Sequence, residues 1–460
     1  MAKKQPNVII FFTDQQRWDT MGLNGNPLGL TPNLDRLARG GTFLKNAVTC
    51  QPVCGPARSC LQTGQYATQT GVWCNGNALD TEAVTLAKCF KKAGYRTGYI
   101  GKWHLAGNGE RLGPVKEHLR GGYEDWLAAD IVETTSGPYS TLLWNEKNEE
   151  VRMPGYRVDA MTDAAIRYID ERAKQPDQPF FLCMSLLEPH HQNTDDSYPA
   201  PPGYAEQYRG GWTPPDLQAL GGSTPMHLAG YYGMVKRIDE ALGRMMDALK
   251  SLSLEEDTIV AFISDHGCHF KTRNAEYKRT PHESSVRVPM ALWGPGFNHG
   301  GEFTQAAGLI NLPPTLLEAA GIEIPETMQA PSLVPLIRQT AKAWPEASLI
   351  QFGDINKCTG RALRSERWKY AVTIPEGDKP CRFSDTYVET HLYDLQADPY
   401  ELRNLIHEEI YTSVRERFRG MMHEAMKAAG EPPAEILPVE TKPSGQLRVD
   451  YPTGEEMIKR

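Results

Sequence analysis

Two short runs of β-branched and aromatic residues constrain the fold of this chain more than any other feature. The run NVIIFFT leads directly into Asp14 and Gln15, and the later run DTIVAFIS leads into Asp265 and His266. Apolar runs without alternation are typical of strands that are buried on both faces, as in parallel sheets. Because ligands bind beyond the carboxyl ends of such strands, we expect the four polar side chains to meet at one edge of a sheet.

Further strand-like and helix-like segments alternate along the chain. GYRTGYIGKWHL (94–105) and PFFLCMSLLEPHH (179–191) read as strands, whereas 159–174 and 231–252 have the periodicity of amphipathic helices. In the first of these strands, period two brings Lys102 and His104 to one face. We therefore predict an α/β fold, with a large, mostly parallel sheet covered by helices on both faces. Residues 1–345 would form this domain, and strand-like pieces followed by a helix at 408–430 would belong to a smaller domain of residues 346–460.

Charge and hydropathy exclude several classes of partner. The 460 residues carry a net charge of -8 with no cluster of Lys or Arg, so we expect neither nucleic acid nor a membrane as a partner. No apolar run is long enough to span a bilayer, and the N-terminus lacks the apolar core of a signal peptide. This predicts a cytoplasmic protein, or a periplasmic or secreted one if a leader was removed. The oligomeric state is not predicted.

The segment CQPVCGPARSC (50–60) concentrates three of the nine cysteines. An odd number of cysteines in a chain of this size favours free thiols, and the spacing lacks the paired CxxC pattern of a zinc site. Cys54 precedes a predicted short helix that starts near Pro56 and stops at Gly64, and anions are favoured at such a helix start. For an isolated cysteine, however, packing beside a turn is the preferred interpretation.

The combination of motifs changes that interpretation, because the chain resembles the type I sulfatases of the alkaline phosphatase superfamily over most of its length. In that family the cysteine of CxPxR is oxidised to formylglycine by a formylglycine-generating enzyme, and the hydrate of this aldehyde is the nucleophile. Cys54 is the matching position. The family also has a smaller C-terminal α+β domain with a short antiparallel sheet. The segments that carry the resemblance are NVIIFFTDQQRWD, CGPAR, GYRTGYIGKWHL, EPHH, SDHG, EYKRTPHESSVRVP and HLYDLQADPYELRNL.

The resemblance implies a role for each polar side chain in these segments. Hydrolysis of a sulfate monoester needs positive charge around the sulfate oxygens, an in-line nucleophile and an acid for the leaving alcohol. The expected catalytic residues are Cys54, Arg58, Lys102, His104, His190 and Lys278. Arg58 would steady the nucleophile, and Lys102 and Lys278 would bind sulfate oxygens. His104 would accept a proton from the nucleophile, and His190 would assist the leaving group.

The resemblance also implies one divalent cation beside the nucleophile. Its expected ligands are Asp14, Gln15, Cys54, Asp265 and His266. Oxygen-rich ligation suits calcium. Many relatives have a second aspartate in place of Gln15 and an asparagine in place of His266, so manganese is the alternative ion.

The predicted function is hydrolysis of a sulfate ester of a carbohydrate or other small molecule. One alternative is a phosphonate monoester or phosphodiester hydrolase with the same nucleophile, and another is a non-catalytic binding protein in which Cys54 is unmodified. Polar and aromatic residues near the motifs are candidates for substrate binding: Trp73, Asn75, Asn77, Trp103, His191, Gln192, Asn193, His269 and Arg273.

Overall fold

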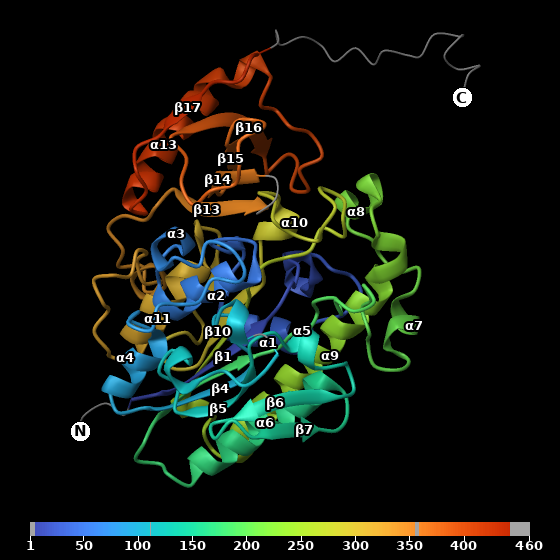
Figure 1. Ribbon diagram of the computed structural model, residues 1–460, viewed down its shortest axis with the longest axis vertical. Helices are drawn as coiled ribbons and strands as arrows, with labels where there is room; N and C mark the ends of the chain where they lie inside the picture. Colours follow the sequence, from blue (N-terminus) through green and yellow to red (C-terminus); the bar gives the residue numbers. More distant parts are fainter. Residues whose placement is uncertain (1–4, 111, 355–357, 442–460) are drawn as a thin grey trace.

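The computed structural model describes residues 5–110, 112–354 and 358–441, which form a large body and a smaller one above it in Figure 1. Within these ranges, ten strands form the sheet of the large body, in the order β11-β2-β10-β9-β1-β8-β4-β5-β6-β7. The five central strands, which are parallel to one another, are β9 (Thr258–Ser264), β1 (Asn7–Thr13), β8 (Phe180–Ser185), β4 (Arg96–Lys102) and β5 (Asp125–Ala129).

The flanking strands make the sheet mixed. Strands β10, β6 and β7 pair antiparallel to their neighbours, and β11 pairs parallel to β2. Their bounds are β11 (Gly301–Phe303), β2 (Thr42–Leu44), β10 (Met290–Trp293), β6 (Thr141–Asn145) and β7 (Glu150–Met153). The prediction of a large, mostly parallel sheet is confirmed for its centre, where β1 and β9 are buried at every position.

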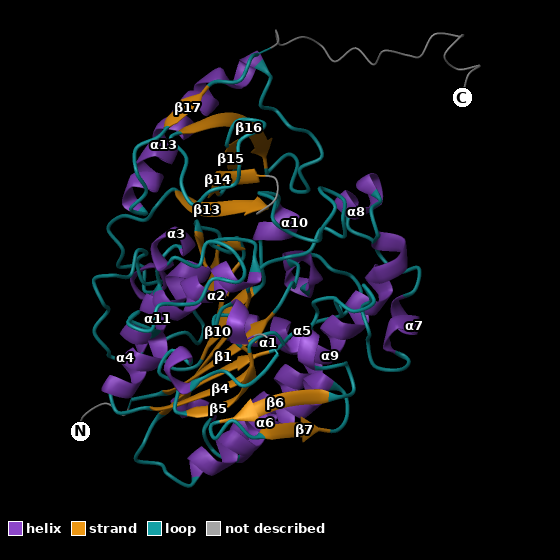
Figure 2. Ribbon diagram, in the orientation of Figure 1, coloured by secondary structure: helices purple, strands orange, loops and turns teal. Residues whose placement is uncertain are grey.

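Helices cover both faces of this sheet (Figure 2). Alternate residues of β1 enter different cores, because Val8 and Ile10 pack on one face and Ile9 and Phe11 on the other. The first face is covered by α2 (Cys54–Thr63), α4 (Leu86–Lys92) and α11 (Leu312–Ala319). The second face is covered by α1 (Pro32–Gly40), α6 (Arg157–Ala173) and α9 (Thr224–Ser251).

Several predicted helix boundaries differ from those in the structure. The helix predicted from residue 231 begins at Thr224 in α9, where Pro225 occupies the first turn, a position that proline tolerates because no hydrogen bond is needed from its nitrogen. The helix predicted near Pro56 begins at Cys54 in α2 and ends before Gly64, whose φ of 66° provides the left-handed stop. Cys54 is therefore the first residue of a helix.

The register of the sheet brings the predicted site residues together. Thr13 of β1 lies opposite Ser264 of β9. The next residues along the two strands are Asp14 and Asp265, so both carboxylates leave the same edge of the sheet side by side. This edge is the carboxyl end of the parallel strands, as expected for a ligand site.

The smaller body contains a five-stranded sheet with α13 (Thr412–Ala428) packed against it (Figure 1). Its strands are β13 (Ala347–Asp354), β14 (Cys358–Ser365), β15 (Trp368–Thr373), β16 (Thr386–Asp394) and β17 (Glu435–Leu437). The first four pair antiparallel, and β17 pairs parallel to β16. The division of the chain at residue 345 stays a prediction. Residues 442–460 of the predicted C-terminal domain lie outside the described residues. Among the described helices, none combines the length and the apolar character needed to cross a membrane.

Candidate active site

A buried cluster of potential metal ligands lies where β1, β9 and α2 meet. Asp14, Cys54, Asp265 and His266 each offer one ligand atom, and these atoms lie within 4.8 Å of one another. The Cys54 Sγ is 3.6 Å from Asp14 Oδ1 and 3.3 Å from His266 Nε2. The structure thus brings together four of the five residues predicted to hold a cation.

The donor set of this cluster fits a divalent cation. His266 Nδ1 lies 2.9 Å from the carbonyl oxygen of Gly267, which can only accept, so Nδ1 carries the proton and the Nε2 lone pair faces the cluster. Gln15, the fifth predicted ligand, donates from Nε2 to the Tyr198 hydroxyl, and its buried Oε1 has no hydrogen-bond partner among the described residues. The two carboxylates and the amide oxygen are ligands that calcium prefers, whereas the imidazole nitrogen favours a transition metal such as manganese.

Three cationic side chains surround the cluster. Arg58 donates to Asp14 at 3.0 Å, and Lys102 donates to the same carboxylate oxygen at 2.8 Å. Lys278 lies 2.8 Å from the Cys54 sulfur and 3.2 Å from His190 Nε2. The predicted catalytic residues therefore converge on Cys54 from separate segments of the chain.

Burial and charge act against each other on the acids of this site. Burial opposes ionisation of the Cys54 thiol, but Lys102 and Lys278 outweigh it and hold the pKa of Cys54 well below its usual value. Burial and the neighbouring Asp14 carboxylate raise the pKa of Asp265 to about 7. Because two adjacent carboxylates resist simultaneous ionisation, a bound cation would favour the doubly ionised pair.

The two predicted catalytic histidines lie in the wall of one cavity. His104 follows β4 with a φ of 58°, and neither of its ring nitrogens has a hydrogen-bond partner within the described chain. His190 follows β8, and its Nδ1 lies 2.7 Å from the carbonyl oxygen of His191. That contact assigns a proton to Nδ1, so an acid role requires a second proton on Nε2, the nitrogen next to Lys278.

The cavity above Cys54 has a volume of about 660 Å³, which is large enough for a sugar-sized ligand. Three of the predicted substrate-binding residues, Asn75, His191 and Asn193, line it. Glu133 also lines it and was not predicted. The residue lies in no recognised motif, and its signal in the sequence was an acidic residue just after the strand-like segment DWLAADI.

Three other substrate candidates have structural roles instead. Trp103, the first residue after β4, is fully buried and packs against the rings of Tyr99 and Trp126. Gln192 is buried and donates to the carbonyl oxygen of Glu133. Asn77 donates to the carbonyl oxygen of a nearby glycine, Gly71. None of the three lines the cavity.

His269 and Arg273 also make contacts outside the cavity. His269 is fully buried, with Nε2 at 3.1 Å from the carbonyl oxygen of Lys278. Arg273 donates to the carbonyl oxygens of Tyr400 and Glu401 in the smaller body. Both side chains therefore hold the loop that carries Lys278, and neither lines the cavity.

A second link between the two bodies lies just after this loop. Glu283, the first residue of α10 (Glu283–Val286), accepts from Lys369 at 2.7 Å and from Arg364 at 3.1 Å, and all three side chains are buried. Lys369 also pairs with Glu401. The segment from residue 273 to 283 is thus held at both ends by the smaller body.

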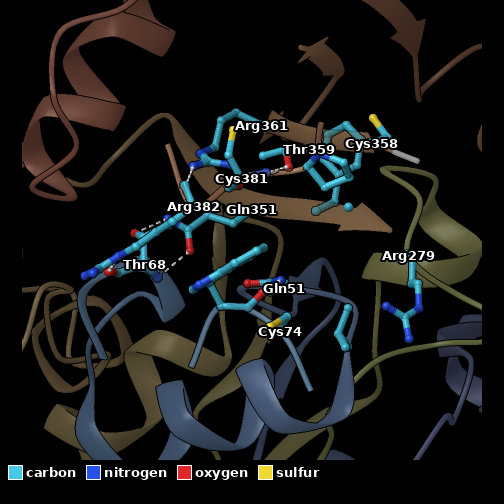
Figure 3. A pocket seen from close by; sticks show the side chains of 15 residues that line it. Gln51, Thr68, Cys74, Arg279, Gln351, Cys358, Thr359, Arg361, Cys381 and Arg382 are labelled. Atoms are coloured by element: carbon cyan, nitrogen blue, oxygen red, sulfur yellow. Dashed lines mark hydrogen bonds between the residues drawn. The ribbon is translucent and has the colours of Figure 1, made fainter. Parts of the chain in front are cut away.

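Trp73 lines a different cavity, between the two bodies (Figure 3). Figure 3 shows Arg361 and Cys381 of the smaller body facing Gln51 and Thr68 of the larger one. The cavity between the two bodies has a volume of about 20 Å³, which is room for about one water molecule. A sugar does not fit there, so Trp73 does not contact substrate through this cavity.

Comparison with known proteins agrees with this geometry. The sequence matches the family described as Sulfatase over residues 6–322, and the family described as N-sulphoglucosamine sulphohydrolase, C-terminal, over residues 275–428. It is 31% identical to an ulvan-active sulfatase of Formosa agariphila over 446 residues, which cover 93% of this chain and 82% of the relative. It is 22% identical to an N-acetylglucosamine-6-O-sulfatase of Bacteroides thetaiotaomicron, over 92% of this chain and 87% of that protein.

A solved structure supports the same relationship. The crystal structure of the putative sulfatase yidJ from Bacteroides fragilis aligns with a TM-score of 0.78 at 26% identity, covering 94% of this chain and 98% of the other. The family match spans all ten described strands of the large sheet, and the two relatives align with more than nine-tenths of the chain. We conclude that this chain belongs to the type I sulfatase family of the alkaline phosphatase superfamily and is a sulfuric ester hydrolase.

Proposed function

We propose that this protein hydrolyses a sulfate ester of a carbohydrate or other small molecule, with formylglycine at position 54 and one calcium ion. The observation that carries the proposal is the contact between the Cys54 sulfur and Lys278 Nζ, at 2.8 Å. Both residues line the cavity, and Cys54 belongs to the cluster of potential metal ligands. A nucleophile in that position is surrounded by the positive charge that an anionic ester requires.

The chemistry at position 54 explains why a thiol would not suffice. Attack by a thiolate on sulfur would leave a stable covalent product. A formylglycine hydrate carries two hydroxyl groups, so one can attack sulfur and the other can then expel sulfate and restore the aldehyde. A cation held by Asp14, Gln15, Asp265 and His266 would favour ionisation of the attacking hydroxyl and neutralise a sulfate oxygen.

Each remaining polar residue has a defined task in the proposal. Lys102 and Lys278 bind sulfate oxygens, and Arg58 orients the nucleophile through its contact with Asp14. His104, whose ring nitrogens are free of other hydrogen bonds in the described chain, accepts the proton of the second hydroxyl. His190 protonates the leaving alcohol.

Leaving-group dependence separates the two histidines. His190→Ala should slow hydrolysis of alkyl or sugar sulfates by about 10²- to 10⁴-fold, but should affect aryl sulfates much less, because acidic phenols depart with little help. His104→Ala should instead trap covalent sulfate on residue 54, because the second hydroxyl loses its base. Rates for a series of leaving groups, together with mass spectrometry of quenched enzyme, measure both effects. Equal losses across the series in His190→Ala would contradict the acid assignment.

A side-by-side assay tests the proposed function. Protein produced together with a formylglycine-generating enzyme should cleave 4-nitrophenyl sulfate faster than 4-nitrophenyl phosphate or a phenyl phosphonate monoester. The opposite order would favour the phosphonate or phosphodiester hydrolase. Conversion of Cys54 should lower the mass of its peptide by about 18 Da. An unmodified peptide and no turnover would favour a non-catalytic binding protein.

A further inference from the structure

Glu133 is a buried carboxylate in the cavity wall that the predicted catalytic set does not include. It lies in α5 (Val132–Thr135), just beyond the end of β5, and its side chain is 4% exposed. Glu133 Oε1 accepts from Lys102 at 2.8 Å, whereas Oε2 has no hydrogen-bond partner among the described residues. The same cavity contains Cys54, His104 and His190.

The free oxygen of Glu133 carries negative charge. Burial alone would raise the pKa of Glu133, but Lys102 and then His190 lower it to about 2. The Lys102 ammonium is shared, because it donates to Asp14 as well as to Glu133. A buried, ionised oxygen without a donor is unfavourable, so this position is suited to a ligand that supplies one.

Hydrogen bonds to its backbone carbonyl oxygens hold the turn that carries Glu133 in place. Gln192 Nε2 donates to the carbonyl oxygens of Glu133 and Ser136, at 3.0 and 3.2 Å. Arg157, in turn, lies within 3.4 Å of Gln192 Oε1. The carboxylate is therefore positioned before substrate arrives, which favours a binding role because little ordering is needed.

We propose that Glu133 binds substrate, with Oε2 accepting a hydrogen bond from a hydroxyl or ammonium group of the leaving alcohol on the carbon next to the ester. This rests on the proposed function, in which Lys102 binds a sulfate oxygen. Because Glu133 contacts Lys102 directly, a group that reaches Oε2 lies within a few bonds of the sulfate. An ether or other acceptor at that position would face a carboxylate without a proton to share.

Matched sulfate esters test this assignment with the unaltered enzyme. The probes are 2-hydroxycyclohexyl, 2-aminocyclohexyl and 2-methoxycyclohexyl sulfate, each as cis and trans isomers. For one isomer series, kcat/KM of the hydroxyl or ammonium ester should exceed that of the methoxy ester by about 10- to 100-fold, the usual value of a hydrogen bond to a charged group. Whichever of the hydroxyl and ammonium esters has the higher kcat/KM identifies the donor that the site prefers.

Glu133→Gln provides the matching variant. Gln Oε1 can still accept from Lys102, while its NH₂ group would take the place of Oε2. The ratio of kcat/KM for the hydroxyl or ammonium ester to kcat/KM for the methoxy ester should then fall to about one or below. Glu276→Gln is the control, because Glu276 lines the same cavity but pairs with Arg279, and it should keep the wild-type ratio.

The outcomes separate this inference from the proposed function. If Glu133→Gln lowered kcat/KM by the same factor for all three esters, the ratio between the donor and methoxy esters would be unchanged. That result would mean that Glu133 only positions Lys102, and it would overturn the inference. A wild-type enzyme that cleaves 4-nitrophenyl sulfate but shows no preference among the cyclohexyl esters would overturn it too, whether or not the variant folds. Failure to cleave any sulfate ester, including 4-nitrophenyl sulfate, would reject the sulfatase proposal itself and the inference with it.

Discussion

Cys54→Ala is expected to fold normally and to lose sulfate-ester hydrolysis by about 10⁵-fold or more, as for other enzymes that lose their nucleophile. No other described side chain could replace the nucleophile. The neighbours of Cys54 are an amine, Lys278, an imidazole, His266, and a carboxylate, Asp14. None of these groups has a second hydroxyl that could expel sulfate after an attack on sulfur, as a formylglycine hydrate has. The measurement is kcat/KM with 4-nitrophenyl sulfate, together with thermal unfolding.

Cys60→Ala is the matched control for this prediction. Cys60 lies in the same helix, α2, and is fully buried in the hydrophobic core. Its replacement leaves a small cavity and should cost about 1 kcal/mol of unfolding free energy, with little change in kcat/KM. Pure Cys54→Ala protein that retained activity within about 100-fold of wild type would contradict the assignment of the nucleophile.

Asp265→Asn is expected to remove the bound cation and to lower activity by about 10³-fold. Asparagine keeps the oxygen that accepts from the backbone nitrogens of Gln15 and His266, but it loses the charge that the cation requires. Metal analysis of purified protein should fall from about one ion per chain to near zero. In the wild type, chelation should abolish activity, and calcium or manganese should restore it.

Asp239→Asn distinguishes this effect from the general cost of losing a buried carboxylate. Asp239 is 2% exposed and lies in α9, where it accepts from the backbone nitrogens of Asn33 and Leu34 at the start of α1. This variant should be less stable but should keep its metal. Asp265→Asn protein that still held one ion per chain, or active wild-type protein with two zinc ions, would contradict the proposed site.

The sequence predicted the sheet and the cluster at its edge because both depend on local pattern. Buried apolar runs specify strands, and Asp14 and Asp265 follow two such runs directly, so the parallel register brings them together. The prediction for Trp103 and His104 extended the strand too far. Strand β4 ends at Lys102, and His104 has a φ of 58°, so strand alternation does not set the directions of Trp103 and His104. Trp103 is fully buried in the core.

Other site features depend on contacts between distant segments, which no local pattern reports. Arg273 lies near a motif, yet its partners are carbonyl oxygens of Tyr400 and Glu401 in the other body. Glu133 follows a strand of the sheet, but its position beside Lys102 results from how β4 and β5 pair. Proximity to a motif therefore indicated the neighbourhood of the site and not the direction of each side chain.

The attachment of residues 273–283 to the smaller body has a consequence for how such enzymes diversify. Lys278 reaches Cys54 from a loop whose ends are fastened to residues of that body, through Arg273 on one side and Glu283 on the other. The two bodies are therefore not interchangeable modules. In a chimaera that took its C-terminal part from a relative, the contacts that position the loop of Lys278 would change. Recombination between family members should therefore preserve turnover only when the loop and the residues that hold it are exchanged together.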